Sequence, residues 1–233
     1  MEKIIKYRHE LKYRCSAIQM AIIESRLKDI MRLDAHSHNG IYQIRSLYFD
    51  NLYNRCYYEN ENGTDPREKY RIRIYNANSN RISFECKRKE RSKTYKTACI
   101  ITKDQYYELI NGNQLDEYHD KPELLCKFLF LMQTQHFRPS TIVEYERTPY
   151  VYDIGNVRIT LDRNISSSED YLNFFSDRIL TRPILPQGQH LLEVKYDELL
   201  PVFIKDVLEL GNIQQTTFSK FYLCKKFSMG GLL

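Results

Sequence analysis

The sequence repeats one charged pattern at three places far apart along the chain: a Glu, one intervening residue and a Lys. The three pairs are Glu10/Lys12, Glu85/Lys87 and Glu193/Lys195. Alternate residues of a β-strand point to the same face, so each pair would place a carboxylate beside an ammonium group. Ammonium groups bind phosphate oxygens and carboxylates bind hard divalent cations. The pattern therefore predicts a site for a metal-bound phosphate compound.

Other segments gather basic side chains on one strand face in the same way. Arg71 and Arg73 share a face with Tyr75, while the isoleucines between them point to the opposite face. A plain amphipathic sheet with a solvated face would also alternate like this, and its exposed ion pairs would contribute little. A solvated face normally carries Thr, Ser and Gln as well, whereas the polar face here is close to wholly ionic. We therefore favour an enclosed cavity, because a wall so rich in cations is costly unless a polyanion occupies it.

About eight strands, with helices in their connections, must position these side chains. Strand-like alternation occurs at 4–15, 42–49, 69–75, 81–89, 96–101, 141–152, 157–162 and 191–196. Helices are predicted at 16–32, 102–112, 122–135, 201–210 and 219–227. Ser16 caps the first helix, and Thr102 with Gln105 forms a capping box for the second, which Gly112 ends. The predicted fold class is α+β: a closed eight-stranded antiparallel β-barrel with helices packed outside, forming one domain over residues 1–233.

Composition limits the class of protein. The chain has 233 residues, 42% hydrophobic content and a formal net charge of only +5, which describes a globular protein rather than a nucleic-acid coat. Its six cysteines form no C-x-x-C pair, and no run reaches the ~18 apolar residues of a membrane span. We expect a reduced, cytoplasmic location, with any membrane association through a partner protein. We expect no nucleic-acid partner, although the basic run at 87–93 would also suit one.

Taken together, the charged motifs resemble those of the VTC domain, the polyphosphate polymerase branch of the CYTH-like triphosphate tunnel metalloenzyme superfamily. The resemblance runs from Arg8 to about Phe227, with the motifs in the order of the family. They are Arg-x-Glu-x-Lys-Tyr at 8–13, Arg-Ser-Leu-Tyr-Phe-Asp at 45–50, Lys-Tyr-Arg-Ile-Arg-Ile-Tyr at 69–75, Glu-Cys-Lys at 85–87, Tyr-Glu-Arg at 145–147, Val-Arg-Ile-Thr-Leu-Asp at 157–162, Leu-Glu-Val-Lys at 192–195 and Phe-Ser-Lys-Phe at 218–221. Each motif is weak alone, and their shared order makes the resemblance specific.

The resemblance implies an activity and a set of site residues. Members of this branch form an eight-stranded tunnel and transfer the terminal phosphate of a nucleoside triphosphate such as ATP to a growing polyphosphate chain, with a divalent metal (Mn²⁺ or Mg²⁺). The implied phosphate clamp is Lys12, Arg71, Arg73, Lys87, Arg147, Arg158 and Lys220. Further implied substrate contacts are Arg8, Lys93, Lys96, Tyr145, Ser219 and Lys195. Glu193 is the implied main metal ligand, and Glu10 is a second candidate.

One departure from the wider superfamily bears on the chemistry. Arg8 stands where tunnel triphosphatases typically carry the first Glu of Glu-x-Glu-x-Lys. The exchange removes a metal ligand and adds a cation, which favours holding phosphate over activating water, and it is usual in the VTC branch. Glu144 and Glu146 alternate with Tyr145 and Arg147, so they are expected to point outward into solvent.

The sequence leaves three functions open. The chain could be a polyphosphate polymerase, a tunnel triphosphatase that hydrolyses tripolyphosphate or nucleotides, or a non-catalytic binder of polyphosphate, nucleotide or RNA. Phosphoryl transfer needs positioning and charge neutralisation more than a nucleophilic side chain, so we expect none. His36 and His38 have a spacing that would suit a metal, but they are expected to face solvent.

Overall fold

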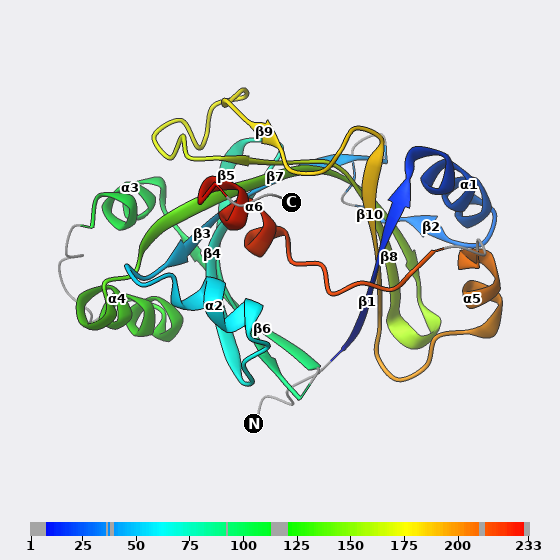
Figure 1. Cartoon of the computed structure of the whole chain (residues 1–233), viewed down its shortest axis with the longest axis horizontal. Coiled ribbons are helices and arrows are strands. Elements are labelled where there is room, and N and C mark those ends of the chain that lie inside the picture. The colour runs from blue at the N-terminus through cyan, green and yellow to red at the C-terminus, as the bar shows by residue number, and fades with distance from the viewer. Residues whose placement is uncertain are drawn as a thin grey trace.

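The computed structural model of the protein is one curled antiparallel sheet with helices around it (Figure 1). It describes residues 8–35, 37, 40–91, 93–112, 121–209 and 213–230, and the prediction for His36 and His38 lies outside them. In sheet order the eight main strands of this part are β1 (His9–Ser16), β10 (Gln189–Tyr196), β8 (Val157–Ser168), β7 (Arg138–Tyr152), β3 (Tyr42–Asp50), β4 (Arg67–Tyr75), β5 (Asn78–Glu90) and β6 (Lys93–Ile101). Two short strands, β2 (Arg32–Leu33) and β9 (Arg182–Pro183), pair with β7 and β8.

Six α-helices and a short 3₁₀ turn complete the described part of the chain. The helices are α1 (Ala17–Lys28), α2 (Arg55–Glu61), α3 (Lys103–Asn111), α4 (Glu123–Gln135), α5 (Val202–Leu208) and α6 (Lys220–Ser228), and the turn is η1 (Ile154–Asn156). None of the described helices is long and apolar enough to cross a lipid bilayer.

The prediction of a closed barrel is wrong, because the sheet is an open, curled half-barrel in the described residues. Its edge strands β1 and β6 meet at a single isolated bridge between Arg8 and Thr94. Both residues lie at the start of antiparallel strands. In an antiparallel ladder, each residue after Arg8 would pair with a residue before Thr94, and β6 begins at Lys93. The strand β1 therefore runs past the end of the β5–β6 hairpin and has no partner residues there. The two edges can face each other without forming a ladder.

Tight turns and caps explain why several elements begin and end where the sequence predicts. Asn76 and Ala77, both with φ of 51°, make the two-residue turn between β4 and β5. Ser16 and Thr102 each form a capping box with the Gln three residues later, which confirms both predicted helix starts. Gly112 ends α3 in the left-handed conformation that glycine adopts without strain.

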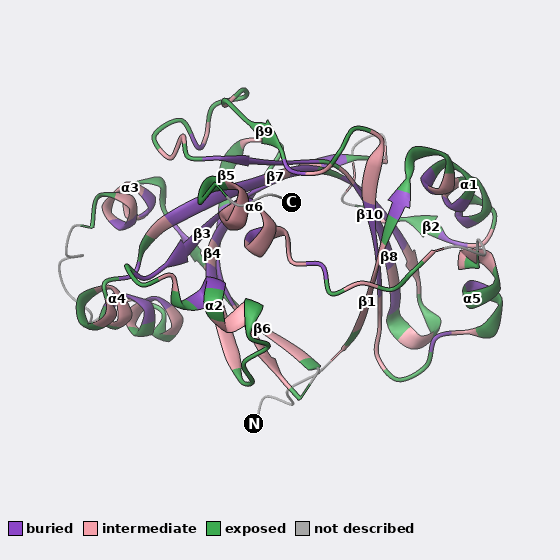
Figure 2. Ribbon diagram, in the orientation of Figure 1, coloured by how far each residue is buried: buried purple, intermediate pink, exposed green. Residues whose placement is uncertain are grey.

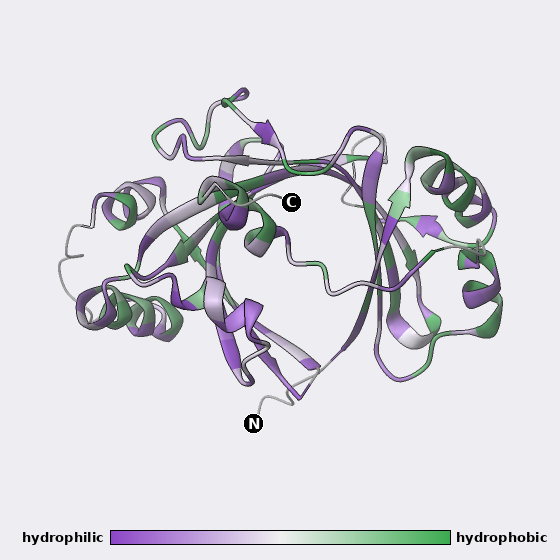
Figure 3. Ribbon diagram, in the orientation of Figure 1, coloured by the Kyte–Doolittle hydropathy of each residue, from purple (hydrophilic) through white to green (hydrophobic). Residues whose placement is uncertain are grey.

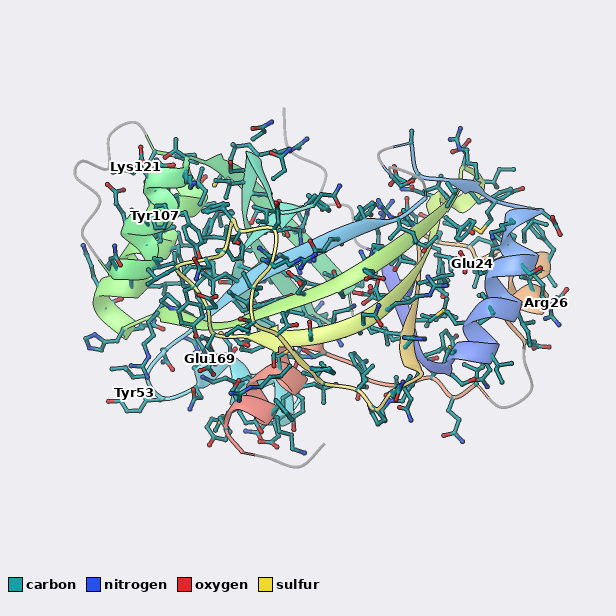
Figure 4. The ribbon with its side chains drawn as sticks, turned by 90° about the horizontal axis from the view of Figure 1, so that it is seen from above. Glu24, Arg26, Tyr53, Tyr107, Lys121 and Glu169 are labelled. Carbon is teal, nitrogen blue, oxygen red and sulfur yellow. The ribbon has the colours of Figure 1, made fainter. Side chains whose placement is uncertain are left out.

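Two helical layers cover the outer face of the sheet on opposite sides (Figures 1 and 4). On one side α3 packs against β7 and α4 packs against β5 and β6, and Phe128 of α4 contacts Phe49 and Phe84 with ring centroids 4.8 and 4.9 Å apart. On the other side α1 and α5 pack with β1, β10 and β8 in a second core, which includes Ile23 and Ile204. Along these helices buried positions alternate with exposed ones (Figure 2), and hydrophobic positions alternate with polar ones (Figure 3).

The helices α2 and α6 differ from the prediction that all helices pack outside. The helix α6 lies in front of one mouth of the curled sheet and contacts α2 (Figure 1). The helix α2 itself was not predicted from the sequence. The amide groups of Cys56 and Tyr57 at the start of α2 donate to the carboxylate of Asp50, at distances of 2.8 and 3.1 Å. The first helix ends at Lys28, earlier than the predicted residue 32, because Arg32 belongs to β2 and pairs with Val151 of β7.

Candidate functional site

The inner face of the curled sheet carries the charged side chains, and strand register brings them together. Glu10 lies opposite Lys195, Lys12 opposite Glu193, and Lys87 opposite Lys96. The residues between them point to the outer core, as strand alternation requires. Most of the predicted site residues therefore face one space. Lys93 is an exception because it falls on the outward phase of β6, while Arg8 and Arg158 share the inward phase but pair with Asp197 and Asp34 near the ends of their strands.

Glu193 is the centre of this group of charged side chains, which we call the ionic wall. Its other members are Glu10, Lys12, Arg71, Arg73, Glu85, Lys96, Arg147, Asp162, Lys195 and Lys220. The carboxylate of Glu193 accepts from Lys220 of α6 at 2.5 Å and from Lys195 of its own strand at 2.9 Å, and Arg147 of β7 lies 3.6 Å away. Burial alone would raise the pKa of Glu193, but these cations and Lys12 outweigh it and hold the pKa well below the ordinary value. Three separate elements thus aim cations at one ionised, 4% exposed carboxylate.

Glu10 is a second ionised carboxylate beside Glu193. Lys87 donates to it at 2.8 Å, and Lys12 and Lys195 lie 3.6 and 3.8 Å away. Burial raises the pKa of Glu10, while Lys87, Lys12 and Lys195 together lower it well below its usual value. Because Lys195 touches both carboxylates, Glu10 and Glu193 border the same small volume.

Asp162, which the sequence analysis did not assign to the site, holds two of the clamp residues. Its fully buried carboxylate accepts from Nε and Nη2 of Arg147, at 2.6 and 2.7 Å, and from Lys220 at 2.6 Å. Burial raises its pKa, but Arg147 and Lys220 lower it further, so the group is ionised. The sequence did contain a signal for this role, because strand alternation places Asp162 on the same face as Arg158 and Thr160.

A second group of clamp residues lies on β4 and β5. Arg71 binds Glu85 at 2.6 Å and the hydroxyl of Tyr48 at 2.9 Å, and Lys96 reaches the same Glu85 at 3.0 Å. Burial raises the pKa of Glu85, whereas Arg71, Arg73 and Lys96 lower it strongly. Arg73 differs from its neighbours because it donates to the hydroxyls of Ser46 and Tyr145 rather than to a carboxylate.

Tyr145 and Ser219 complete the wall. The Tyr145 ring lies under two cations, with Lys220 Nζ 4.7 Å and Arg147 Cζ 5.2 Å from its centroid. Ser219 is the N-cap of α6: its hydroxyl accepts from the amide of Tyr222 at 3.3 Å and from Lys69 at 3.1 Å. Capping fixes the first turn of α6, and with it the position of Lys220.

Four predicted residues lie elsewhere or make other contacts. Arg8 pairs with Asp197 at 2.9 Å, and Lys93 lies opposite Glu90, on the hairpin face that carries Arg88. Arg158 binds Asp34 and the hydroxyl of Tyr42, both at 2.8 Å, at the mouth opposite α6. The expectation that Glu144 is solvated is wrong, since it binds the buried guanidinium of Arg45 on the outer face of the sheet.

The mouth at Arg158 opens into a cavity of about 610 Å³. The rings of Tyr42 and Tyr75 lie edge to face in its wall, with centroids 5.5 Å apart. Glu85 and Lys96 also line it, so the cavity reaches the ionic wall from this side. Alternation divides the described residues of the basic run at 87–93 between the two faces of the hairpin, with Lys87 and Lys89 facing inward and Arg88 outward.

The donor set fits a divalent cation that shares its shell with phosphate. No group of three or more His, Cys, Asp or Glu side chains gathers at metal-binding distance within the described residues. Mg²⁺ is commonly held by one or two carboxylates together with substrate phosphates and water rather than by a complete protein cage. Glu193 and Glu10 are ionised and border one volume, which matches that smaller requirement.

Comparison with known proteins identifies the class. The family described as VTC domain matches residues 7–228, and the chain belongs to this family. Among solved structures, HpAC1 from Hippeastrum, a protein with a dominant triphosphatase activity, is 16% identical over 97% of both chains with a TM-score of 0.56. PH1819 from Pyrococcus horikoshii is 16% identical over 93% of this chain and 97% of that one, with a TM-score of 0.48. A search of curated proteins found no match.

Proposed function

We propose that the protein is a metal-dependent polyphosphate polymerase that transfers the terminal phosphate of a nucleoside triphosphate, ATP in the first instance, to a growing polyphosphate chain. Membership of the VTC domain family and the tunnel-like fold support an enzyme that acts on triphosphates. The observation that carries the proposal is the convergence of Lys220, Lys195 and Arg147 on Glu193 from three elements. Cations held in this way are ready to bind a phosphate chain without reorganisation.

The residues of the wall would divide the work of phosphoryl transfer. Arg71, Arg73 and Arg147 are the forked donors that match phosphate oxygens, and Lys12, Lys87 and Lys220 supply point charges. Glu193 and Glu10 would hold a Mn²⁺ or Mg²⁺ ion, which would supply charge neutralisation between adjacent phosphate groups. The protein would hold the donor triphosphate and the acceptor phosphate in line, which is the main requirement of this reaction.

The state of the carboxylates favours transfer to phosphate over hydrolysis. A general base is most effective when its pKa is near the working pH. The pKa values of Glu10, Glu193 and Asp162 are all held below the ordinary range by the surrounding cations. These groups are therefore poor bases for activating water. Hydrolysis is nevertheless the second candidate, because the fold is shared with HpAC1, whose dominant activity is that of a triphosphatase.

Product analysis distinguishes the three functions. Purified protein is incubated with ATP labelled on the terminal phosphate and with Mn²⁺ or Mg²⁺, and the products are separated by size. Labelled chains longer than ATP support the polymerase, labelled inorganic phosphate supports the triphosphatase, and unchanged ATP that remains bound supports a binder.

We also propose a cytoplasmic location, where ATP is available, and delivery of the chain to a membrane-protein partner.

Arg73→Gln is the sharpest variant for this test. Its hydrogen bonds go to the hydroxyls of Ser46 and Tyr145 rather than to a carboxylate, so the substitution breaks no direct ion pair. We expect turnover to fall at least a hundredfold, on the scale of a lost charge-stabilising donor, with little change in unfolding temperature. Arg88→Gln, on the outer face of β5, removes the same charge and should leave turnover unchanged. Equal activity of the two variants would remove Arg73 from the phosphate site.

A further inference from the structure

A second group of cations lies between the ionic wall and the mouth covered by α2 and α6. It consists of Arg67 and Lys69 on β4 and of Lys87 and Lys89 on β5, and we call it the mouth cluster. The β4–β5 register places Lys69 directly opposite Lys87, and Arg67 directly opposite Lys89. Like charges in directly opposed positions of a sheet destabilise it. Two successive opposed cation pairs on one face therefore need an explanation beyond the stability of the fold.

Lys69 is the most confined member of the cluster. Its ammonium group donates to Asn60 of α2 at 2.6 Å and to Ser219 at 3.1 Å, and it lies 5.2 Å from the ring centroid of Phe221. No carboxylate lies within ion-pairing distance of Lys69 among the residues that the structure describes. Burial, followed by the charges of Arg67 and Lys87, lowers the pKa of Lys69 to about 7.

Nearby carboxylates do not neutralise the cluster. Glu10 pairs with Lys87 but is shared with Lys12 and Lys195. Glu68, next in sequence to Lys69, points to the outer face, where it binds Lys127 at 2.9 Å. Within the ionic wall, by contrast, Arg71, Arg147 and Lys220 each contact a carboxylate. Among the described residues, Arg67, Lys69 and Lys89 thus make no ion pair with a carboxylate, in contrast to these cations of the ionic wall.

The opposite mouth has a different chemistry. It presents the rings of Tyr42 and Tyr75, and its cation Arg158 is paired with Asp34. An extended polyanion that starts at the ionic wall would therefore gain more charge compensation toward α2 and α6 than toward this mouth. Successive inward residues of β4 are about 7 Å apart, so Lys69 and Arg67 extend the row of Arg73 and Arg71 outward.

We propose that the mouth cluster is a second phosphate-binding section, which holds the part of a polyphosphate chain that extends beyond the ionic wall and guides it out past α2 and α6. The inference rests on the proposed function for its ligand, an inorganic polyphosphate. It assigns a binding role to Lys69, Arg67 and Lys89, and it gives the channel a direction. A triphosphate, which is short, would stay within the ionic wall, whereas a long chain would engage both sections.

Chain-length-dependent binding tests this assignment. Calorimetric titrations with tripolyphosphate and with long-chain polyphosphate compare the wild type with Lys69→Met and Lys89→Gln. We expect each variant to bind the long chain about tenfold more weakly, as for the loss of one charge-assisted contact, and to bind tripolyphosphate within twofold of the wild type. Arg88→Gln is the matched control, since it removes one charge from the outer face of the same strand.

The possible outcomes separate this inference from the proposed function. Equal weakening for both ligands would place Lys69 in the ionic wall, and unchanged binding of both would mean that the cluster binds no phosphate; either result overturns the inference. A variant that loses stability but binds both ligands normally would also overturn it, because Lys69 would then serve the fold. If the wild type makes no chains from ATP, yet the long chain still depends on Lys69, the polymerase proposal fails and the second section stands.

Discussion

At the scale of single residues, the site depends on buried carboxylates that fix the cations around them. Asp162 makes no contact with solvent, and it holds Arg147 by two hydrogen bonds and Lys220 by a third contact. We infer that it is a positioning residue, because it is covered by the side chains that would touch phosphate. Removing one partner of a buried ion pair is strongly destabilising, because the charge that remains buried is no longer compensated.

Asp162→Asn should therefore lower the free energy of unfolding by about 3 kcal/mol, measured by urea denaturation. Tripolyphosphate should restore part of this loss, because its oxygens can compensate Arg147 and Lys220. The matched control is Asp153→Asn, which breaks an exposed Asp–Arg pair with Arg32 and should change stability by less than about 1 kcal/mol. If Asp162→Asn proved as mild as the control, the central network would contribute little to the fold.

A second residue-scale prediction concerns Lys69 and pH. Its folded-state pKa of about 7 is below the value of 10.5 that an ordinary lysine keeps in the unfolded chain. The unfolded state then binds the proton more tightly, so the charge of Lys69 destabilises the fold fully below pH 7 and this cost disappears as pH rises toward 10.5. Lys69→Met should be more stable than the wild type at pH 7, with the difference shrinking by pH 10.

Thermal unfolding of both proteins between pH 6.5 and 10 measures this difference. Arg67, Lys87 and Lys12 face Lys69 and are present in both proteins, as is the neutral thiol of Cys56, whose pKa is raised well above its usual value by burial. Their own titration therefore largely cancels in the comparison. A difference that stayed constant over this range would mean that Lys69 keeps an ordinary pKa.

Strand alternation made most of the candidate site predictable at this scale. Arg71, Arg73 and Glu193 face inward because period-two patterning assigns every second residue to one face, and no tertiary information is needed. Alternation also argues against Lys93, which lies three residues before Lys96 and therefore falls on the outward phase of β6. The contact of Arg8 was not predictable in this way, because its partner Asp197 is distant in sequence.

At the scale of elements, α6 decides whether the site is complete. It supplies Lys220, and its buried Phe221 packs against Tyr48 with ring centroids 5.1 Å apart. The segment before it is held by Lys12, which donates to the carbonyl of Phe218 at 2.7 Å and accepts from Thr216 through its own carbonyl at 2.8 Å. The helix is therefore attached to the same strand that carries Glu10.

Removing the anchor should separate α6 from the sheet. Phe221→Ala should cost about 3–5 kcal/mol of stability and should weaken tripolyphosphate binding, because Lys220 would no longer be fixed beside Glu193. Denaturation and calorimetry measure the two effects. Phe130→Ala on α4 makes the same substitution at a side chain that is 59% exposed and should leave both nearly unchanged. Normal binding by Phe221→Ala would show that α6 is not needed to position Lys220.

Elements were predictable where local signals define them. The capping boxes at Ser16 and Thr102 and the glycine at Gly112 act within a few residues, so α1 and α3 begin, and α3 ends, as expected. The helix α2 has no side-chain cap of its own, and its start depends on Asp50 at the end of β3. The place of α6 at the mouth is likewise set by contacts distant in sequence, which no local pattern encodes.

At the scale of the whole molecule, the sheet leaves an open seam between β1 and β6, where the sequence predicted closure. Period-two patterning identifies strands and their faces, but closure depends on the stagger between the first and last strands, which patterning does not report. The seam is held by the Arg8–Thr94 bridge and by the ion pair between Lys87 and Glu10. The prediction that residues 1–233 form one domain stays a prediction.

An open seam should make hydrogen exchange uneven around the sheet. Amides of β6, an edge strand, should exchange much faster than those of β7, which is paired on both sides by β3 and β8. Tripolyphosphate with Mg²⁺ should slow exchange in β1 and β6, because an anion that binds Lys12, Lys87 and Lys96 together would hold the two edges near each other. At about one hundred times the dissociation constant the slowing could reach roughly a hundredfold at amides that exchange only from the unbound, open state.

Hydrogen exchange with mass spectrometry resolves these peptides, and α3 on the outer layer serves as the internal control. Slowing confined to 8–16 and 93–101 would mean that the ligand acts at the seam, because a general gain in stability would not select those two edges. If β6 were already as protected as β7 without ligand, the barrel would be closed in solution. If the ligand slowed exchange everywhere except at the seam, the phosphate chain would not bridge the edges of β1 and β6.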